Sequence, residues 1–197
     1  MAHLGVFGGS FNPVHWGHLH VVLLAREAAG FDEVVYVPAA SPPHKPVWEL
    51  APSRDRWEML SRALRNETGS SLSDVELLPG GPRYTVDTLD LLKERHPGWK
   101  ISFVLGTDSL AEFDSWREPE RLVNEYGLVA VNRPGLVAAT VDARWRGRVT
   151  LVEGNPFAIS SSAIRARVAK GLAIRHLVPA LVEATIVERG LYRPGKP

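Results

Sequence analysis

The stretch that decides the fold reads Gly8-Gly9-Ser10-Phe11-Asn12-Pro13-Val14-His15-Trp16-Gly17-His18. An apolar run at residues 3–7 precedes it and predicts a short buried strand that stops at the Gly-Gly pair. From about Gly17 to Ala29, apolar residues recur on one face, which predicts a helix that ends before Gly30. This order of strand, glycine turn and helix favours an anion site. Glycine lets backbone amides approach a phosphate, and a helix start offers unpaired N–H groups and the positive end of its dipole.

Two histidines add side-chain donors to this loop. His15 and His18 are three residues apart, so both rings fall on one side of a first helical turn, and each ring offers an N–H donor. A transition-metal cluster of His15, His18 and His20 is the alternative, but the chain has no cysteine and Glu27 lies far along the helix. We therefore interpret the pair as phosphate ligands and His20 as a residue of the helix surface.

Composition limits the class of protein. With 197 residues, 45% of them hydrophobic, the chain can bury a substantial core, and we expect one domain over residues 1–197. The 23 basic and 22 acidic residues nearly balance and form no basic block, so neither nucleic acid nor an anionic membrane is indicated. The chain has no cysteine, leader or apolar run near ~20 residues, which favours a cytoplasmic protein with a small-molecule partner. The oligomeric state is left open, with a homo-oligomer among the alternatives.

Short apolar runs alternate with amphipathic segments along the rest of the chain. We expect strands at residues 33–37, 72–78, 101–105, 128–131 and 149–152, and helices at residues 53–64 and 86–95. The alternation predicts a Rossmann-like, doubly wound α/β fold, in which a mostly parallel sheet carries helices on both faces. Ligands of such folds bind beyond the carboxyl ends of the strands, where the glycine loop begins. Neither GxGxxG nor GxxxxGK[ST] occurs, so phosphates are held by other means.

A second anion site is predicted near the C-terminus. Ser160-Ser161-Ser162 opens a predicted helix that runs to about Lys170, and one serine suffices as its N-cap. The remaining hydroxyls and amides, together with Arg165 about one turn on, suit an anion. Pro179 fits the start of a last helix, so residues 160–190 form a small C-terminal helical part.

These motifs resemble a known family. The loop at residues 8–18 resembles the HxGH signature of the nucleotidyltransferase superfamily, and its wider wording is similar to that of bacterial nicotinate-nucleotide adenylyltransferases. Further matching segments stand in the family's order: Pro42-Pro43-His44-Lys45, Tyr84-Thr85-Val86-Asp87-Thr88-Leu89, Gly106-Thr107-Asp108, Trp116, Arg133-Pro134-Gly135 and Ile159-Ser160-Ser161-Ser162-Ala163-Ile164-Arg165. Ser162 stands where the family commonly has threonine, which keeps the hydroxyl. The resemblance extends to Leu191-Tyr192, nearly the whole chain.

The resemblance implies adenylyl transfer from ATP to nicotinate mononucleotide in NAD biosynthesis, with His15 and His18 as the catalytic residues. The residues implied for ATP are Gly8, Gly9, Ser10, Phe11, His15, His18, Gly106, Asp108, Arg133, Ser160, Ser161, Ser162, Ile164 and Arg165. Those implied for nicotinate mononucleotide are Asn12, His44, Lys45, Tyr84, Thr85 and Trp116. Mg²⁺ is the expected cofactor, held mainly by substrate phosphates and water rather than by protein ligands.

Other interpretations stay open at this point. Trp116 suits an apolar core, Asp108 and Arg133 suit structural ion pairs, and Lys45 suits an exposed loop. A nicotinamide mononucleotide or pantetheine-phosphate adenylyltransferase, or a cytidylyltransferase, would share the histidine loop. A nucleotide-sensing module without catalysis is the alternative from another class.

Overall fold

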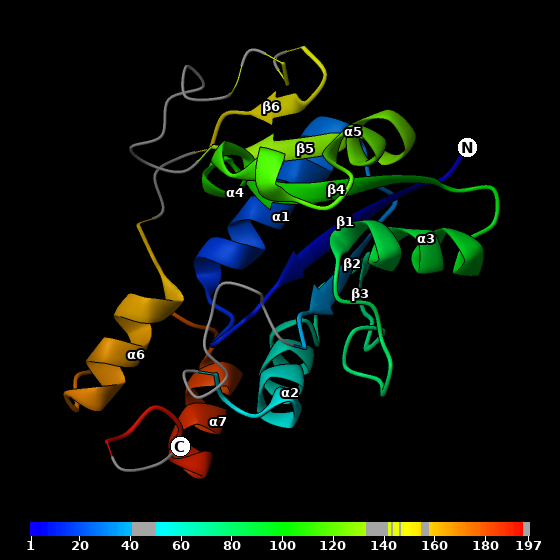
Figure 1. Ribbon diagram of the computed structural model, residues 1–197. Helices are drawn as coiled ribbons and strands as arrows, with labels where there is room; N and C mark the ends of the chain where they lie inside the picture. Colours follow the sequence, from blue (N-terminus) through cyan, green and yellow to red (C-terminus); the bar gives the residue numbers. More distant parts are fainter. Residues whose placement is uncertain (41–49, 133–141, 143, 146, 155–157, 195–197) are drawn as a thin grey trace.

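The computed structural model describes residues 1–40, 50–132, 142, 144–145, 147–154 and 158–194. Its centre is a six-stranded sheet with the strand order β3-β2-β1-β4-β5-β6, and all five pairings are parallel (Figure 1). The strands are β1 (His3–Gly9), β2 (Glu33–Pro38), β3 (Ser70–Leu72), β4 (Lys100–Gly106), β5 (Leu128–Val131) and β6 (Thr150–Val152). This arrangement confirms the predicted Rossmann-like fold.

Helices cover both faces of the sheet (Figure 1). One apolar cluster joins the sheet to α1 (Trp16–Ala29), α2 (Ser53–Ala63), α6 (Ser161–Ala169) and α7 (Ala180–Arg189). The other joins it to α3 (Thr85–Arg95), α4 (Thr107–Ala111) and the short turns at Phe113–Ser115 and Leu122–Tyr126, between which lies α5 (Pro119–Arg121). The C-terminal helices α6 and α7 therefore share a core with the sheet.

The strands read as apolar runs because they are buried from both sides. In β2, Val35 and Val37 point into the cluster under α3, whereas Val34 and Tyr36 point into the cluster under α1. A strand covered on both faces needs apolar residues at successive positions, unlike a half-exposed strand. None of the helices in the described part of the chain has both the length and the apolar character needed to span a membrane.

The strand expected at residues 72–78 is wrong for most of its length. β3 ends at Leu72, and the chain then turns, with Leu77 N and Leu78 N donating to Asp74 O at 2.7 and 3.2 Å. Val75 is only 1% exposed and joins the core from this turn. The apolar residues here fill the core without extending a strand, and the sequence pattern does not distinguish the two cases.

The strand order places a crevice beyond the carboxyl ends of the neighbouring strands β1 and β4. The chain passes from β1 outward to β2 and β3, then returns to place β4 on the other side of β1. Ligand sites in doubly wound sheets form at this reversal, outside the carboxyl ends of the strands. Gly8–Ser10 and Gly106–Asp108 lie at these two strand ends, so the fold brings two predicted segments together.

Candidate active site

Two stacked imidazoles stand at the start of α1. His15 is the N-cap residue and is 2% exposed, and its ring stacks on that of His18 with centroids 3.7 Å apart and planes 29° apart. His15 N donates to His18 Nδ1 at 3.2 Å. A ring nitrogen that accepts carries no proton, so His18 holds its proton on Nε2. This hydrogen bond fixes the tautomer and leaves Nε2–H as the donor of His18.

Gly17, between the two histidines, leaves room for this stack. It is buried, and a Cβ at this position would lie 3.0 Å from His15 Nδ1 and 3.1 Å from His15 Cε1. Such contacts are tighter than nine in ten real Cβ contacts, so the His15 ring would have to move by a few tenths of an ångström to admit a side chain. The spacing of the two histidines and the glycine between them therefore form one geometric unit.

A cavity of about 330 Å³ lies against this unit. Its lining includes Gly8, Gly9, Ser10, His15, His18, Gly106, Asp108, Ser160, Ser161 and Ser162. These residues come from the loop after β1, the end of β4 and the start of α6. Most residues that the sequence implies for ATP thus meet around one cavity.

The three serines at the start of α6 have different partners. Ser160 Oγ accepts a hydrogen bond from Ala163 N at 3.1 Å, so Ser160 is the serine that caps the helix. Ser161 Oγ donates to Pro13 O at 2.9 Å, and Ser162 Oγ accepts from Arg165 Nη2 at 3.4 Å. The start of α6 is therefore bonded directly to the histidine loop.

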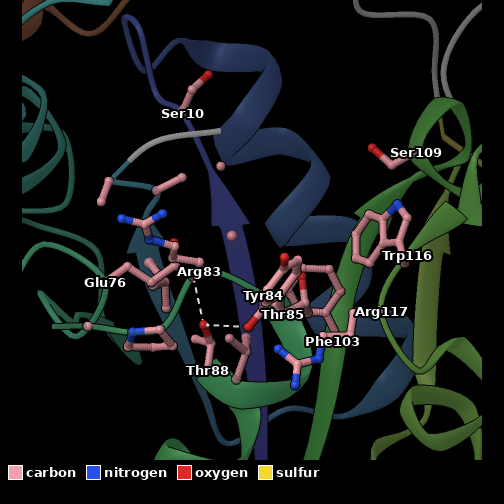
Figure 2. A pocket seen from close by; sticks show the side chains of 18 of the residues that line it. Ser10, Glu76, Arg83, Tyr84, Thr85, Thr88, Phe103, Ser109, Trp116 and Arg117 are labelled. Atoms are coloured by element: carbon pink, nitrogen blue, oxygen red, sulfur yellow. Dashed lines mark hydrogen bonds between the residues drawn. The ribbon is translucent and has the colours of Figure 1, made fainter. Parts of the chain in front are cut away.

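A larger cavity of about 550 Å³ adjoins the first one (Figure 2). Gly8, Gly9, Ser10, Phe103, Ser109 and Trp116 line both cavities, so the two spaces meet at the loop after β1. Tyr84 and Thr85, at the start of α3, line the larger cavity as the resemblance implies. Trp116 also packs edge-on against Phe103, with centroids 5.8 Å apart, so it is partly core and partly cavity wall.

Glu76 brings a carboxyl group to the larger cavity, and sequence reasoning missed it. Thr88 Oγ1 donates to Glu76 Oε1 at 2.8 Å and lies 3.2 Å from Tyr84 O (Figure 2). Burial raises the pKa of Glu76, and the hydrogen bond from Thr88 opposes this shift. The carboxyl group therefore holds its proton to a higher pH than an exposed glutamate does.

Arg56 is a second residue that the sequence did not reveal. It is 1% exposed, and burial lowers the pKa of its guanidinium. Its hydrogen-bond acceptors are the carbonyl oxygens of Ser10 at 2.9 Å, Ala39 at 2.8 Å, Ala40 at 3.4 Å and Ala51 at 3.1 Å. Ser10, Ala39 and Ala40 line the larger cavity, so Arg56 binds the carbonyl oxygens of three residues of its wall. A single arginine on an amphipathic helix gives no sequence signal of this role.

Asn12 holds the histidine loop in place from within. It is 1% exposed, and its Oδ1 accepts from Ala51 N at 3.0 Å and from Tyr192 OH at 2.9 Å. Its backbone oxygen accepts from Arg165 Nη1 at 3.0 Å. Three distant segments thus meet at this residue.

Two further residues implied for ATP do not line either cavity. Phe11 and Ile164 are fully buried in the apolar cluster under α1. His44, Lys45 and Arg133 lie outside the described residues.

Comparison with known proteins shows to which family the chain belongs. The cytidylyltransferase-like family matches residues 6–167. Probable nicotinate-nucleotide adenylyltransferases of Rubrobacter xylanophilus and Gloeobacter violaceus are 39% and 40% identical to this chain, each over 96% of it, and the matches cover 92% and 95% of those proteins. The chain belongs to the nicotinate-nucleotide adenylyltransferase family. The probable nicotinate-nucleotide adenylyltransferase of Salinibacter ruber is 38% identical to this chain, and the match covers 97% of this chain and 98% of that protein.

A solved structure shows the same fold. Nicotinic acid mononucleotide adenylyltransferase of Plasmodium falciparum, complexed with NaAD, superposes with a TM-score of 0.80 at 23% identity, covering 98% of both chains. Membership of the nicotinate-nucleotide adenylyltransferase family confirms the resemblance drawn from the histidine loop and the segments that follow it.

Proposed function

We propose that this chain transfers the adenylyl group of ATP to the 5′-phosphate of nicotinate mononucleotide. A phosphate oxygen attacks the α-phosphorus and forms a new P–O bond, the bond to the bridging oxygen breaks, and pyrophosphate leaves with the electron pair. Nicotinate adenine dinucleotide is the second product. The observation that carries this proposal is that two cavities meet at Gly8–Ser10, beside the His15–His18 stack.

In this proposal the smaller cavity takes the triphosphate. The attacking phosphate is already anionic, so no protein nucleophile is needed, and the protein aligns the two phosphates and stabilises charge on the leaving oxygens. His15 and His18 supply this stabilisation together with the amides after β1 and at the start of α6. We assign Asp108 to ribose or nucleotide positioning and, from the resemblance, Arg133 and Arg165 to the ATP side.

The larger cavity takes the mononucleotide. The Trp116 indole offers a flat face for the pyridine ring, and the amides at the start of α3, beside Tyr84 and Thr85, suit its carboxylate. From the resemblance we assign His44 and Lys45 to the mononucleotide phosphate. We assign Asn12 to the support of this site through its bonds to Ala51 and Tyr192.

Mg²⁺ fits the smaller cavity as a companion of the triphosphate. No three His, Asp or Glu side chains gather into a metal site within the described ranges, and of the described residues that line the smaller cavity Asp108 alone carries a carboxylate. Mg²⁺ prefers oxygen ligands and keeps much of its water, so this donor set suits an ion held mainly by phosphate oxygens and water. When bound, it neutralises charge on the phosphates.

We further propose that residues 1–197 act as one catalytic domain, with residues 160–190 completing the ATP site, and that the enzyme works in the cytoplasm. The hydrogen bonds from Ser161 and Arg165 to Pro13 and Asn12 support the first proposal. The nearly balanced charge and the lack of cysteine support the second.

Pyrophosphate release tests the reaction. Purified protein is mixed with ATP, Mg²⁺ and, in separate reactions, nicotinate mononucleotide, nicotinamide mononucleotide or phosphopantetheine. We expect pyrophosphate and dinucleotide with nicotinate mononucleotide. ATP binding without pyrophosphate from any mixture would favour a sensing module, and a preference for the amide would overturn the substrate but not the reaction type.

A further inference from the structure

The larger cavity carries four side chains with formal charges among its described lining residues: Glu76, Arg83, Glu112 and Arg117. Arg117 already has partners. Its guanidinium lies 4.8 Å from the centroid of the Tyr84 ring, and it pairs with Asp87 at 3.5 Å and Glu118 at 3.6 Å. Arg117 therefore packs on the Tyr84 ring and forms an ion pair with Asp87 of α3.

Arg83 differs from Arg117 in having no such partner. Within the described ranges its guanidinium makes no hydrogen bond or ion pair, and its side chain is exposed. It directly precedes Tyr84, the N-cap residue of α3. Figure 2 shows Arg83 and Glu76 on one side of the cavity and Trp116 on the other. An uncommitted cation thus lines the side of the cavity opposite Trp116.

The charges of this wall favour an anion. Burial raises the pKa of Glu76, which reduces its negative charge, and Thr88 occupies one of its oxygens. Asp87 and Glu118 already pair with Arg117, so among the described lining residues Arg83 is the cation left for a ligand anion, and the carboxylate of Glu112 is exposed. A ring that carries a carboxylate is favoured in this field over one that carries a neutral amide.

We propose that Arg83 determines specificity by pairing with the ring carboxylate of the mononucleotide, which makes the enzyme prefer the acid over the amide. This inference rests on the proposed function, in which the mononucleotide occupies the larger cavity with its ring against Trp116. A carboxylate accepts two parallel hydrogen bonds from a guanidinium, whereas a carboxamide is neutral and offers one acceptor oxygen.

The position of Arg83 separates the ring carboxylate from the phosphate of the substrate. The attacking phosphate must reach the junction of the two cavities at Gly8–Ser10, close to the histidines. Arg83 lines the larger cavity but is absent from the lining of the smaller one. It is therefore placed for the ring end of the mononucleotide.

The test compares Arg83→Gln and Arg83→Lys with the matched control Arg117→Gln. The measured quantity is kcat/KM for nicotinate mononucleotide divided by kcat/KM for nicotinamide mononucleotide, at saturating ATP. We expect Arg83→Gln to lower this ratio about tenfold through loss of activity on the acid alone, since a charge-assisted bidentate contact at an exposed site is of that order. Arg83→Lys should keep part of the preference, and Arg117→Gln should keep the ratio.

Two outcomes would overturn the inference. An unchanged ratio in Arg83→Gln would mean that the guanidinium does not distinguish the ring carboxylate from the carboxamide. An equal loss of kcat/KM on both substrates would mean that Arg83 contacts a group that both share or acts structurally. If the wild-type protein makes no dinucleotide, the proposed function fails. Calorimetric binding of the two mononucleotides to wild type and Arg83→Gln then still decides whether Arg83 discriminates between them.

Discussion

At the scale of single residues, the histidine pair depends on one short-range hydrogen bond. His18 Nδ1 accepts from His15 N, so the proton of His18 sits on Nε2, and the stack with His15 limits rotation of the ring. Donors fixed in this way before substrate arrives cost no reorganisation during the reaction. Glycine between the histidines keeps this geometry, because a Cβ there would press on the His15 ring.

His18→Ala should therefore lower kcat about a hundredfold or more, the usual loss for one preorganised donor, while the fold is kept. Steady-state pyrophosphate release measures the rate, and the thermal unfolding midpoint checks the fold. His20→Ala is the control, since His20 lies on α1 but outside the lining of both cavities. An unchanged rate in His18→Ala would refute the catalytic role.

The raised pKa of Glu76 should make the free energy of unfolding depend on pH. Burial raises its pKa in the folded state above the value of about 4.3 expected in the unfolded chain. The folded state therefore binds the proton more tightly, and this stabilisation is complete below that value and is lost as pH rises through the raised pKa.

Glu76→Gln keeps an acceptor for Thr88 but cannot ionise. The thermal midpoint of this variant, relative to wild type, should therefore rise as pH increases from about 4 to 7. Exposed Glu112→Gln is the control and should follow wild type. Parallel curves for Glu76→Gln and wild type would contradict the assigned shift.

At the scale of elements, α6 is the clearest case in which local sequence signals act alone. Ser160 caps the helix through Ala163 N, as three consecutive serines predict. The strand expected at residues 72–78 shows the opposite case, because Val75 fills the core from a turn. An N-cap is a hydrogen bond between residues three positions apart. Whether an apolar segment forms a strand or a turn depends on the distant residues that pack against it.

Ser160→Ala should lower the free energy of unfolding by about 1 kcal/mol, the usual cost of losing an N-cap side chain. Urea unfolding measures this change. Ser162→Ala is the matched control, because Ser162 accepts only a 3.4 Å bond from Arg165 and does not cap α6. Equal losses in the two variants would show that the cap does not stabilise the helix.

At the scale of the whole molecule, the C-terminal segment holds the site together. Arg189 of α7 pairs with Asp55 and Glu58 of α2, and Tyr192 donates to Asn12, which is 180 residues away in the chain. Arg56 of α2 in turn binds Ser10 O at the end of the same loop. The histidine loop is therefore positioned by α2 and by the C-terminal segment.

Tyr192→Phe should lower the free energy of unfolding by about 1 kcal/mol, because it removes one partly buried hydrogen bond while Ala51 N still satisfies Asn12 Oδ1. Urea unfolding measures the loss, with Tyr84→Phe as the control, since the Tyr84 ring is exposed. Identical unfolding of the two variants would show that this long-range bond adds no stability.

The sequence by itself determined the features that depend on neighbours along the chain. Residues 3–29 predict the strand, glycine turn and helix, the spacing of His15 and His18 predicts the paired donors, and alternating apolar runs predict the parallel sheet. Membership of the family confirms the resemblance that these motifs carry.

Tertiary structure alone decided which distant groups meet. It gathers three cavity-wall carbonyls and Ala51 O around Arg56, brings Tyr192 to Asn12, joins the two cavities at Gly8–Ser10 and leaves Arg83 uncommitted within the described ranges. Periodicity and caps act over a few residues, so a sequence displays them directly. Contacts between residues a hundred or more positions apart arise when the sheet and its helices pack, and no local pattern encodes them.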